Sequence, residues 1–543
     1  MLITSSSREL SALTTATASR ESARPDFLES ALYRIGQPFE ITQNGDGLNL
    51  RPSTNGVSAS PDHEPKSIPV PAFRLENLGD AAFRADHGLR FAYVAGAMAN
   101  GIGSAEVVEA MARAGMLGFF GAAGLSLTAI EAAIDRLSRN IGDLTYGFNL
   151  IHSPNEPDLE QAVVDLYLRR NVRLVEASAY LDLTLPIVRF RVHGIHRDAD
   201  GRVNTPNRVI AKVSRVEVAS KFMAPPPARF LRILLDQGEI TPEQAGLAGR
   251  IPMAQDITAE ADSGGHTDNR PSITLIPTML ALRDRMQAQY DYAQPLRIGA
   301  AGGIATPASA AAAFAMGAAY ILTGSVNQAC LEAGTSEAAR LMLAQAEQAD
   351  TMMAPAADMF EMGVKVQVLK RGTMFPMRAI KLYELYRTCN SLNDLPATER
   401  TTLEKTIFRA PVEEIWRQTR EFFQERDPRQ IERAERDPKH QMALVFRWYL
   451  GQSSRWAKSG DPSRKIDYQI WCGPAMGAFN EWVKGSFLES AEYRRVVPVA
   501  MNILYNAAVL LRAQSLRHQG VSLPANFPRL APLEMEELTL RLD

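Results

Sequence analysis

The chain has 543 residues, 46% hydrophobic side chains and a formal net charge of −2 from 59 basic and 61 acidic residues. This apolar fraction is that of a globular protein and excludes collagen-like or globally disordered classes, while the lack of net positive charge argues against a nucleic-acid-binding protein. Three scattered cysteines are too few for a disulfide framework, and at roughly 150 residues per domain the length suits three or four domains or one large barrel with additions.

Residues 1–85 are expected to form an N-terminal segment, partly disordered, with a possible small module of strands. A turn signal at residues 44–47 separates two short strand-like runs, and a polar linker follows over residues 51–69. The sequence does not begin with a basic stretch followed by an apolar run, so we expect no secretion signal. The uncharged stretch 298–331 is long enough to cross a membrane, but alanine and glycine dominate it, so we interpret it as buried core. We therefore expect a cytoplasmic protein without membrane contact.

Residues 86–375 alternate short apolar runs with helical stretches. Eight runs have the length and composition of buried strands: residues 91–94, 117–120, 146–151, 172–177, 209–213, 256–260, 296–301 and 319–323. Strands that alternate with crossover helices form a parallel sheet, and eight units in about 240 residues is the size of a (β/α)8 TIM barrel. The predicted fold class is therefore α/β, with a doubly wound sheet as the alternative.

Two segments depart from this alternation. Residues 214–250 contain three consecutive prolines and helix-like pieces, which predicts a helical insertion after the fifth strand. In residues 376–543 the apolar residues recur at helical spacing, and all five tryptophans lie there. This pattern predicts a mainly helical C-terminal domain.

Two glycine loops form the clearest candidate site. The predicted seventh strand leads into Gly302 and Gly303, and the eighth ends at Gly324 and Ser325. Consecutive strand–helix units place both loops at one end of a barrel, where glycine backbone N–H groups can hold an anion. Because phosphate commonly binds after strands seven and eight of such barrels, we predict a phosphate site here. The alternative is that these glycines only make tight turns.

Polar residues near the predicted strand ends are further candidates. His266 follows the sixth strand directly after Gly264 and Gly265, whose freedom lets its ring project over the barrel mouth. Imidazole donates or accepts a proton at cellular pH, so His266 is the candidate acid or base, with a structural histidine as the alternative. Three polar residues occur within otherwise apolar strands, where they either line a site or make structural hydrogen bonds: Asn149, Lys212 and Glu260. No metal-ligand cluster, nucleophile elbow or complete dinucleotide fingerprint is present in the sequence.

Longer strings resemble one family. Residues 264–266, 301–304 and 322–325 are similar to the FMN barrels of nitronate monooxygenases and flavin-dependent enoyl reductases. The wider strings resemble the PfaD family, which supplies trans-acting enoyl reductases to polyunsaturated fatty acid and polyketide synthases: residues 260–271, 323–328, 332–336, 358–371, 381–386 and 467–477. The resemblance covers about residues 85–515.

This resemblance implies FMN at the barrel mouth and NADPH (or NADH) as a transient hydride donor. The implied phosphate contacts are Gly302, Gly303, Gly324 and Ser325. The other implied cofactor contacts are Ala97, Met98, Asn149, Glu260, Asp262, Gly264 and Gly265. The carboxylate position of the relatives falls on Ala259, one residue before Glu260. Lys212 is our candidate for a cation beside the flavin edge that becomes negative on reduction.

The implied activity is reduction of α,β-unsaturated acyl thioesters on acyl carrier protein domains, with His266 as proton donor or as the group that polarises the carbonyl. The insertion and the C-terminal helices are expected to form the acyl channel or the carrier-protein dock. The sequence leaves open whether the protein forms a homodimer. Two alternatives are a nitronate monooxygenase-like flavin oxidase and a non-catalytic docking subunit of a synthase.

Overall fold

The computed structural model describes residues 30–44, 47–52, 67–152 and 156–542. The centre of the expected 44–47 turn and most of the expected linker lie outside these residues. Contacts divide the chain into two compact units. One unit comprises Met1–Arg74, Ala508–Leu530 and Met535–Asp543, and the other comprises Leu75–Ala507 and Ala531–Glu534. In this division most of the C-terminal helices group with the barrel.

The larger unit is built on a closed parallel barrel. Its strands are β4 (Tyr93–Ala95), β5 (Leu117–Phe120), β6 (Gly147–Ile151), β7 (Leu174–Ser178), β10 (Arg208–Val213), β11 (Asp256–Glu260), β13 (Arg297–Ala301) and β14 (Ile321–Thr323). All eight predicted strands are confirmed, and β14 closes the barrel by pairing with β4. The strands are almost entirely buried, as expected for parallel strands whose outer face is covered by helices.

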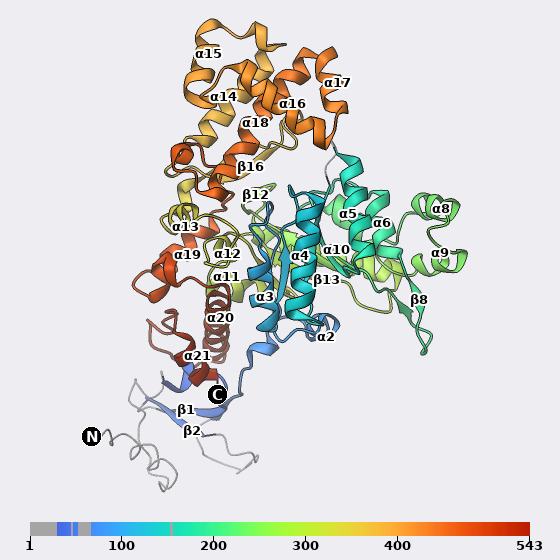
Figure 1. The fold of residues 1–543 in the computed structure, drawn as a ribbon. Helices are drawn as coiled ribbons and strands as arrows, with labels where there is room; N and C mark the ends of the chain where they lie inside the picture. Colours follow the sequence, from blue (N-terminus) through green and yellow to red (C-terminus); the bar gives the residue numbers. More distant parts are fainter. Residues whose placement is uncertain (1–29, 45–46, 53–66, 153–155, 543) are drawn as a thin grey trace, which may run out of the picture. The chain divides into compact units, whose positions relative to one another are not determined.

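α2 (Ala81–His87) lies at the amino end of the barrel, where Phe83 stacks on Tyr320 and His87 binds Asp256. The helices that cover the outside, as Figure 1 shows, are α3 (Ala105–Arg113), α4 (Leu127–Ile141), α5 (Pro157–Arg169), α6 (Leu185–Val192), α10 (Ser272–Tyr290) and α11 (Pro307–Ala315). Hydroxyl side chains start several of them: Ser104 accepts from the Val107 N–H and Thr306 forms a capping box with Ser309. The uncharged stretch 298–331 forms β13, α11 and β14, so its interpretation as buried core is confirmed.

Two additions depart from the simple barrel. After β10 come α7 (Val216–Met223), α8 (Ala228–Asp236) and α9 (Pro242–Ala248), where a helical insertion was expected. A three-stranded sheet that the sequence did not predict consists of β12 (Gly265–His266), β15 (Thr351–Pro355) and β16 (Lys365–Leu369). In it His266 pairs with Val366, so the predicted loop histidine lies on a short strand.

A layer of helices lies over the end of the barrel where β12 and β16 are found (Figure 1). It contains α14 (Phe375–Thr388), α15 (Ala397–Thr402), the π-helical turn Leu403–Phe408, α16 (Val412–Arg426), α17 (Arg429–Arg436) and α18 (Pro438–Ser459). α19 (Ala475–Val483) lies instead beside the barrel, against α12 (Ser325–Gln328). The core of the layer includes Phe375, Leu382, Phe446 and Tyr449, and it continues onto Val366 and Val368 of β16. This shared apolar core explains why the helices do not separate from the barrel as a domain.

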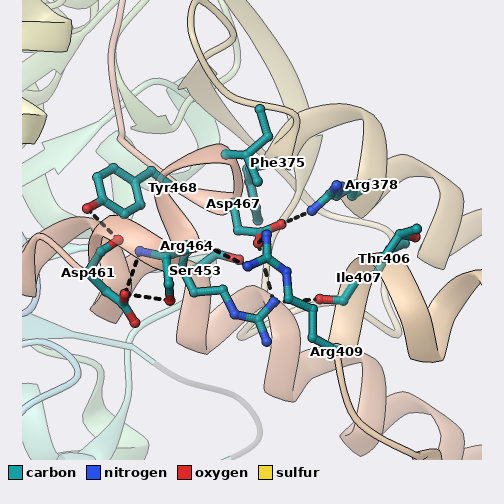
Figure 2. A network of polar contacts seen from close by, with 12 residues as sticks. Phe375, Arg378, Thr406, Ile407, Arg409, Ser453, Asp461, Arg464, Asp467 and Tyr468 are labelled. Atoms are coloured by element: carbon teal, nitrogen blue, oxygen red, sulfur yellow. Dashed lines mark hydrogen bonds and ion pairs between the residues drawn. The ribbon is translucent and has the colours of Figure 1, made fainter.

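A buried carboxylate fixes the end of this helical layer. Asp467 is fully buried, and Figure 2 shows the arginines Arg378, Arg409 and Arg464 gathered on it. Arg378 donates to Oδ1, Arg464 Nη1 lies 3.3 Å from Oδ2 and Arg409 Nη2 lies 3.4 Å from Oδ2. A buried charge needs such partners to offset its lost hydration. The segment that follows Asp467 meets β16, where the Leu369 N–H donates to the Ile470 carbonyl. The arginines on Asp467 hold the start of this segment in place.

The smaller unit contains an antiparallel sheet in the order β2–β1–β3, from β1 (Phe39–Asn44), β2 (Gly47–Pro52) and β3 (Ser67–Val70). Its core joins Phe39 and Ile41 to Leu516 and Phe527. β3 occupies part of the expected linker. In the described part of the chain, α20 (Val496–His518) is long and apolar enough to cross a membrane, but 78% of its apolar window is buried, as in a core helix. α21 (Met535–Leu542) ends the described chain.

Candidate active site

A cavity of about 520 Å³ lies at the carboxyl ends of the barrel strands. Its walls come from the loops after these strands, from α16 and α18, and from the segment around Trp471 and Gly473. The carboxyl ends of barrel strands are where TIM-barrel enzymes hold their reacting groups. The candidate residues that line it are Ala97, Met98, Asn149, Lys212, Glu260, Gly264, Gly265, His266, Gly302, Gly303, Gly324 and Ser325.

The two predicted glycine loops lie side by side at one wall of this cavity. β13 and β14 are neighbours through the pair Ala301 and Leu322, so both loops leave the barrel at the same end. Gly302 has φ +76°, and a Cβ there would lie 2.5 Å from the Ala261 carbonyl carbon. A Cβ on Gly303 or Gly324 would instead enter open space. The space beside the backbone of Gly303 and Gly324 is therefore free of protein atoms, which leaves room there for the predicted phosphate.

Lys212 and Glu260 line the cavity, and the side chain of Glu176 lies buried beside them. Lys212 Nζ lies 3.2 Å from Glu260 Oε1 and 3.9 Å from Glu176 Oε2. Glu176 is fully buried, and burial raises its pKa to about 7 against the opposing effect of Lys212. Burial alone would lower the pKa of Lys212, but Glu260 and Glu176 outweigh it and raise that pKa. The two carboxylates thus favour the charged form of Lys212.

Glu176 was missed by the sequence reasoning, although a lone glutamate in the apolar strand β7 was the signal for it. Its Oε2 accepts a hydrogen bond of 3.2 Å from the Ala97 N–H, and its Oε1 has no partner among the residues that the structure describes. The Glu176 carbonyl accepts a bond from Asn149 Nδ2, which also donates to Ser178 Oγ. Asn149 therefore has structural hydrogen bonds in addition to its place in the cavity wall.

His266 lines the cavity beside an aspartate. Its Nε2 lies 3.2 Å from Asp358 Oδ1, and about a third of each side chain is exposed, 32% and 35%. Burial by itself would lower the pKa of His266, but the negative charge of Asp358 outweighs that effect and raises it. The imidazolium is therefore favoured and can donate a proton. Asp358 was not predicted as a site residue, although it begins one of the strings that carry the family resemblance.

Asp262 differs from the other predicted site residues because it does not line the cavity. Its Oδ1 accepts hydrogen bonds from Asn269 Nδ2 at 2.8 Å and from Gln367 Nε2 at 2.7 Å. These bonds join the loop after β11 to β16. The structure thus gives Asp262 a role in holding the loop that carries His266.

The helical layer supplies the upper wall, which the sequence reasoning did not identify. Its apolar and aromatic members are Phe422, Phe423, Leu444, Trp448 and Trp471. Arg426 binds the carboxylate of Glu156 through two nitrogens, at 2.6 and 3.1 Å. Arg447 Nη1 lies 3.3 Å from Glu361 Oε1. Within the described residues no cluster of three or more histidine, cysteine or acidic side chains could hold a metal ion.

Comparison with known proteins decides the family. The sequence profile of nitronate monooxygenases matches residues 87–402, which is more than half of the chain and includes the whole barrel. The chain belongs to the nitronate monooxygenase family. A second profile, the inserted helical domain of acyl-carrier-protein S-malonyltransferase, matches residues 389–468 in the helical layer.

Relatives place the chain in the PfaD-like branch of this family of flavin-dependent enzymes. It is 45% identical to one of the polyunsaturated fatty acid synthase subunits of Thraustochytrium over 90% of this chain and 33% of that protein. It is 46% identical to the polyketide biosynthesis protein PksE of Bacillus subtilis over 89% of this chain and 63% of that protein. The chain thus spans only part of these relatives.

A solved structure supports the same assignment. The enoyl reductase domain of MlnA, from the macrolactin biosynthesis cluster of Bacillus amyloliquefaciens, is 42% identical and superposes with a TM-score of 0.77. The match covers 82% of this chain and 99% of that domain. The barrel and the helical layer over its mouth are therefore one shared architecture.

Proposed function

We propose that the protein is an FMN-dependent, trans-acting enoyl reductase that acts on α,β-unsaturated thioesters carried by acyl carrier protein domains. The observation that carries the proposal is the single cavity in which two glycine loops, a buried lysine and the His266–Asp358 pair face the same space. The MlnA enoyl reductase domain and the synthase subunits among the relatives support this reaction class.

The residues of this cavity suit FMN. Backbone N–H groups of Gly302, Gly303, Gly324 and Ser325 would hold its phosphate, because glycines leave the backbone accessible. Lys212 would keep a positive charge beside its ring. When bound, FMN would supply hydride transfer from NADPH or NADH to the β-carbon of the unsaturated thioester.

His266 would supply the proton that the α-carbon needs, or would polarise the thioester carbonyl. Burial lowers the pKa of His266, but Asp358, whose Oδ1 lies 3.2 Å from Nε2, raises it overall and so favours the protonated ring. General acid catalysis of this kind contributes about 10²- to 10⁴-fold in rate. The aromatic upper wall would exclude water from the acyl chain, which favours hydride transfer over reaction with solvent.

The partners in this proposal are carrier protein domains of a polyketide or fatty acid synthase, in the cytoplasm. The match of residues 389–468 to a helical domain of a transferase that acts on acyl carrier protein supports a carrier-facing role for the helical layer. The layer forms one wall of the cavity, so a carrier-borne acyl chain can reach the barrel mouth along it.

The test is an anaerobic two-step experiment on the purified protein loaded with FMN. NADPH should bleach the flavin absorption, and crotonyl-pantetheine should restore it without oxygen. A flavin that is reoxidised only by oxygen and that converts a nitronate would support the nitronate monooxygenase activity after which the family is named. A protein that takes up no flavin but binds carrier protein would support a docking subunit.

A further inference from the structure

We infer that Arg455, with Lys458 one turn further along α18, binds the phosphate of an acyl-phosphopantetheine arm whose thioester lies at the barrel mouth. This inference rests on the proposed function and names the part of the substrate that the helical layer recognises. Three features of the described residues carry it: Arg455 on the cavity wall has no acidic partner, Lys458 three residues further along the helix has none either, and the amide of Gln452 on the same helix face makes no hydrogen bond.

Arg455 differs from the other two arginines of the upper wall. Arg426 is paired with Glu156 and Arg447 with Glu361, whereas Arg455 has no carboxylate partner among residues 30–44, 47–52, 67–152 and 156–542. Its guanidinium lies 5.3 Å from the centre of the Phe422 ring, and it is exposed at the cavity. An arginine held in place by stacking, with its donors free, is suited to phosphate.

The surroundings of Arg455 make this wall positive. Arg426 also lies over Phe422, at 5.6 Å, so its charge is near although Glu156 balances it. Lys458 donates to the carbonyl of Asn100, a cavity residue, and it too has no acidic partner within the described chain. Partial burial, and after it the charge of Arg426, lowers the pKa of Arg455. An anion placed here would relieve that repulsion.

The cavity between Arg455 and the barrel suits a pantetheine chain in particular. Gln452, three residues before Arg455, lines the cavity, and its amide makes no hydrogen bond within the described residues. 4′-Phosphopantetheine carries two amide groups that need such a partner, and its phosphate lies at one end. Arg455 and Gln452 share a helix face at i and i+3, so one extended arm can meet both. The aromatic side chains beyond them, Trp448 and Trp471, would cover the apolar part.

Calorimetric binding of 4′-phosphopantetheine and of pantetheine to the FMN-loaded protein tests the inference. We expect the wild type to prefer the phosphorylated compound by roughly 10- to 100-fold, the range of charge-assisted hydrogen bonds. Arg455→Gln should bring this ratio close to one, and Arg455→Lys should retain part of it. The matched control is Arg420→Gln on α16, whose guanidinium lies 3.8 Å from Glu435 and does not line the cavity. The control should keep the wild-type ratio.

Kinetics give a second, independent readout. The KM of S-crotonyl-4′-phosphopantetheine relative to that of S-crotonyl-pantetheine should rise in Arg455→Gln by the same factor. Equal wild-type binding of the two compounds, or equal weakening of both in the variant, would overturn the inference. A variant that loses discrimination between NADPH and NADH instead would assign this wall to the dinucleotide. A preserved phosphate preference without enoyl turnover would refute the proposed function alone.

Discussion

Strand β11 carries a carboxylate at each end, and the two carboxylates have different surroundings. Asp256, at the amino end, is buried and receives hydrogen bonds from His87 Nε2 at 2.8 Å and Arg297 Nε at 2.6 Å. Glu260, at the carboxyl end, shares Lys212 with Glu176 and faces the cavity. The amino end thus pairs its charges within the protein, whereas the carboxyl end holds two carboxylates on one lysine.

The pKa values follow this difference. Burial alone would raise the pKa of Asp256, but His87 and Arg297 outweigh it and lower that pKa. At the mouth, burial dominates and raises the pKa of Glu176 to about 7. Complete pairing stabilises the fold, whereas incomplete pairing leaves groups able to respond to a ligand. The paired charges at the amino end of the barrel therefore stabilise the fold, whereas those at the carboxyl end lie at the site of the proposed reaction.

Removing a partner at the amino end should have the largest effect on stability. Arg297→Met leaves Asp256 and Asp86 without their shared cation, and breaking a buried pair in this way costs about 3–5 kcal/mol. Urea denaturation should show this loss. The control Arg90→Met breaks an exposed pair with Glu76 and should leave the unfolding midpoint nearly unchanged. Equal effects of the two variants would contradict the assignment of stability to this end.

Replacing His266, the proposed proton donor, should affect turnover and not stability. His266→Gln should lower the turnover of an enoyl thioester by about 10²- to 10⁴-fold while FMN still binds. His152→Gln is the matched control, because His152 binds Glu160 at 3.0 Å and does not line the cavity. Unchanged turnover in His266→Gln would remove the histidine from the proposed chemistry.

A methyl group at the glycine wall should weaken FMN binding. Gly324 has a negative φ of −131°, and a Cβ there would enter open space in the cavity. We expect Gly324→Ala to fold normally and to bind FMN roughly 10- to 100-fold more weakly, as for an overpacked site. Gly246→Ala in α9, which also meets nothing, should bind FMN as the wild type does. Flavin fluorescence titration measures both.

The smallest expected effect is a shift in pH dependence. Asp358→Asn removes the charge that raises the pKa of His266 and leaves burial, which lowers it. The alkaline limb of the pH profile of kcat/KM should therefore move to lower pH, because the ring loses its proton earlier. Asp268→Asn is the control, since Asp268 pairs with Arg215 at 2.8 Å and lies outside the cavity. A shift to higher pH in Asp358→Asn would contradict the assigned role.

The barrel could be predicted from sequence because each buried strand is a short apolar run and the crossover helices separate these runs evenly. The two glycine loops could be placed together for the same reason, since consecutive units leave the barrel at one end. Partners that come from distant segments could not be found this way. Asp358 reaches His266 only through the pairing of β12 with β16, and the upper wall depends on how α16 and α18 pack. Asp262 shows the opposite case, because it is close to His266 in the sequence and yet does not line the cavity.

In the proposed function, the glycine ends of β13 and β14 hold the phosphate of FMN. Titrating the flavin-free protein with FMN and with riboflavin, which differ only in that phosphate, tests this role. We expect one FMN per chain and riboflavin bound at least about 10-fold more weakly, the difference expected for several N–H groups on an anion. Equal affinity for the two flavins, or binding of neither, would contradict it.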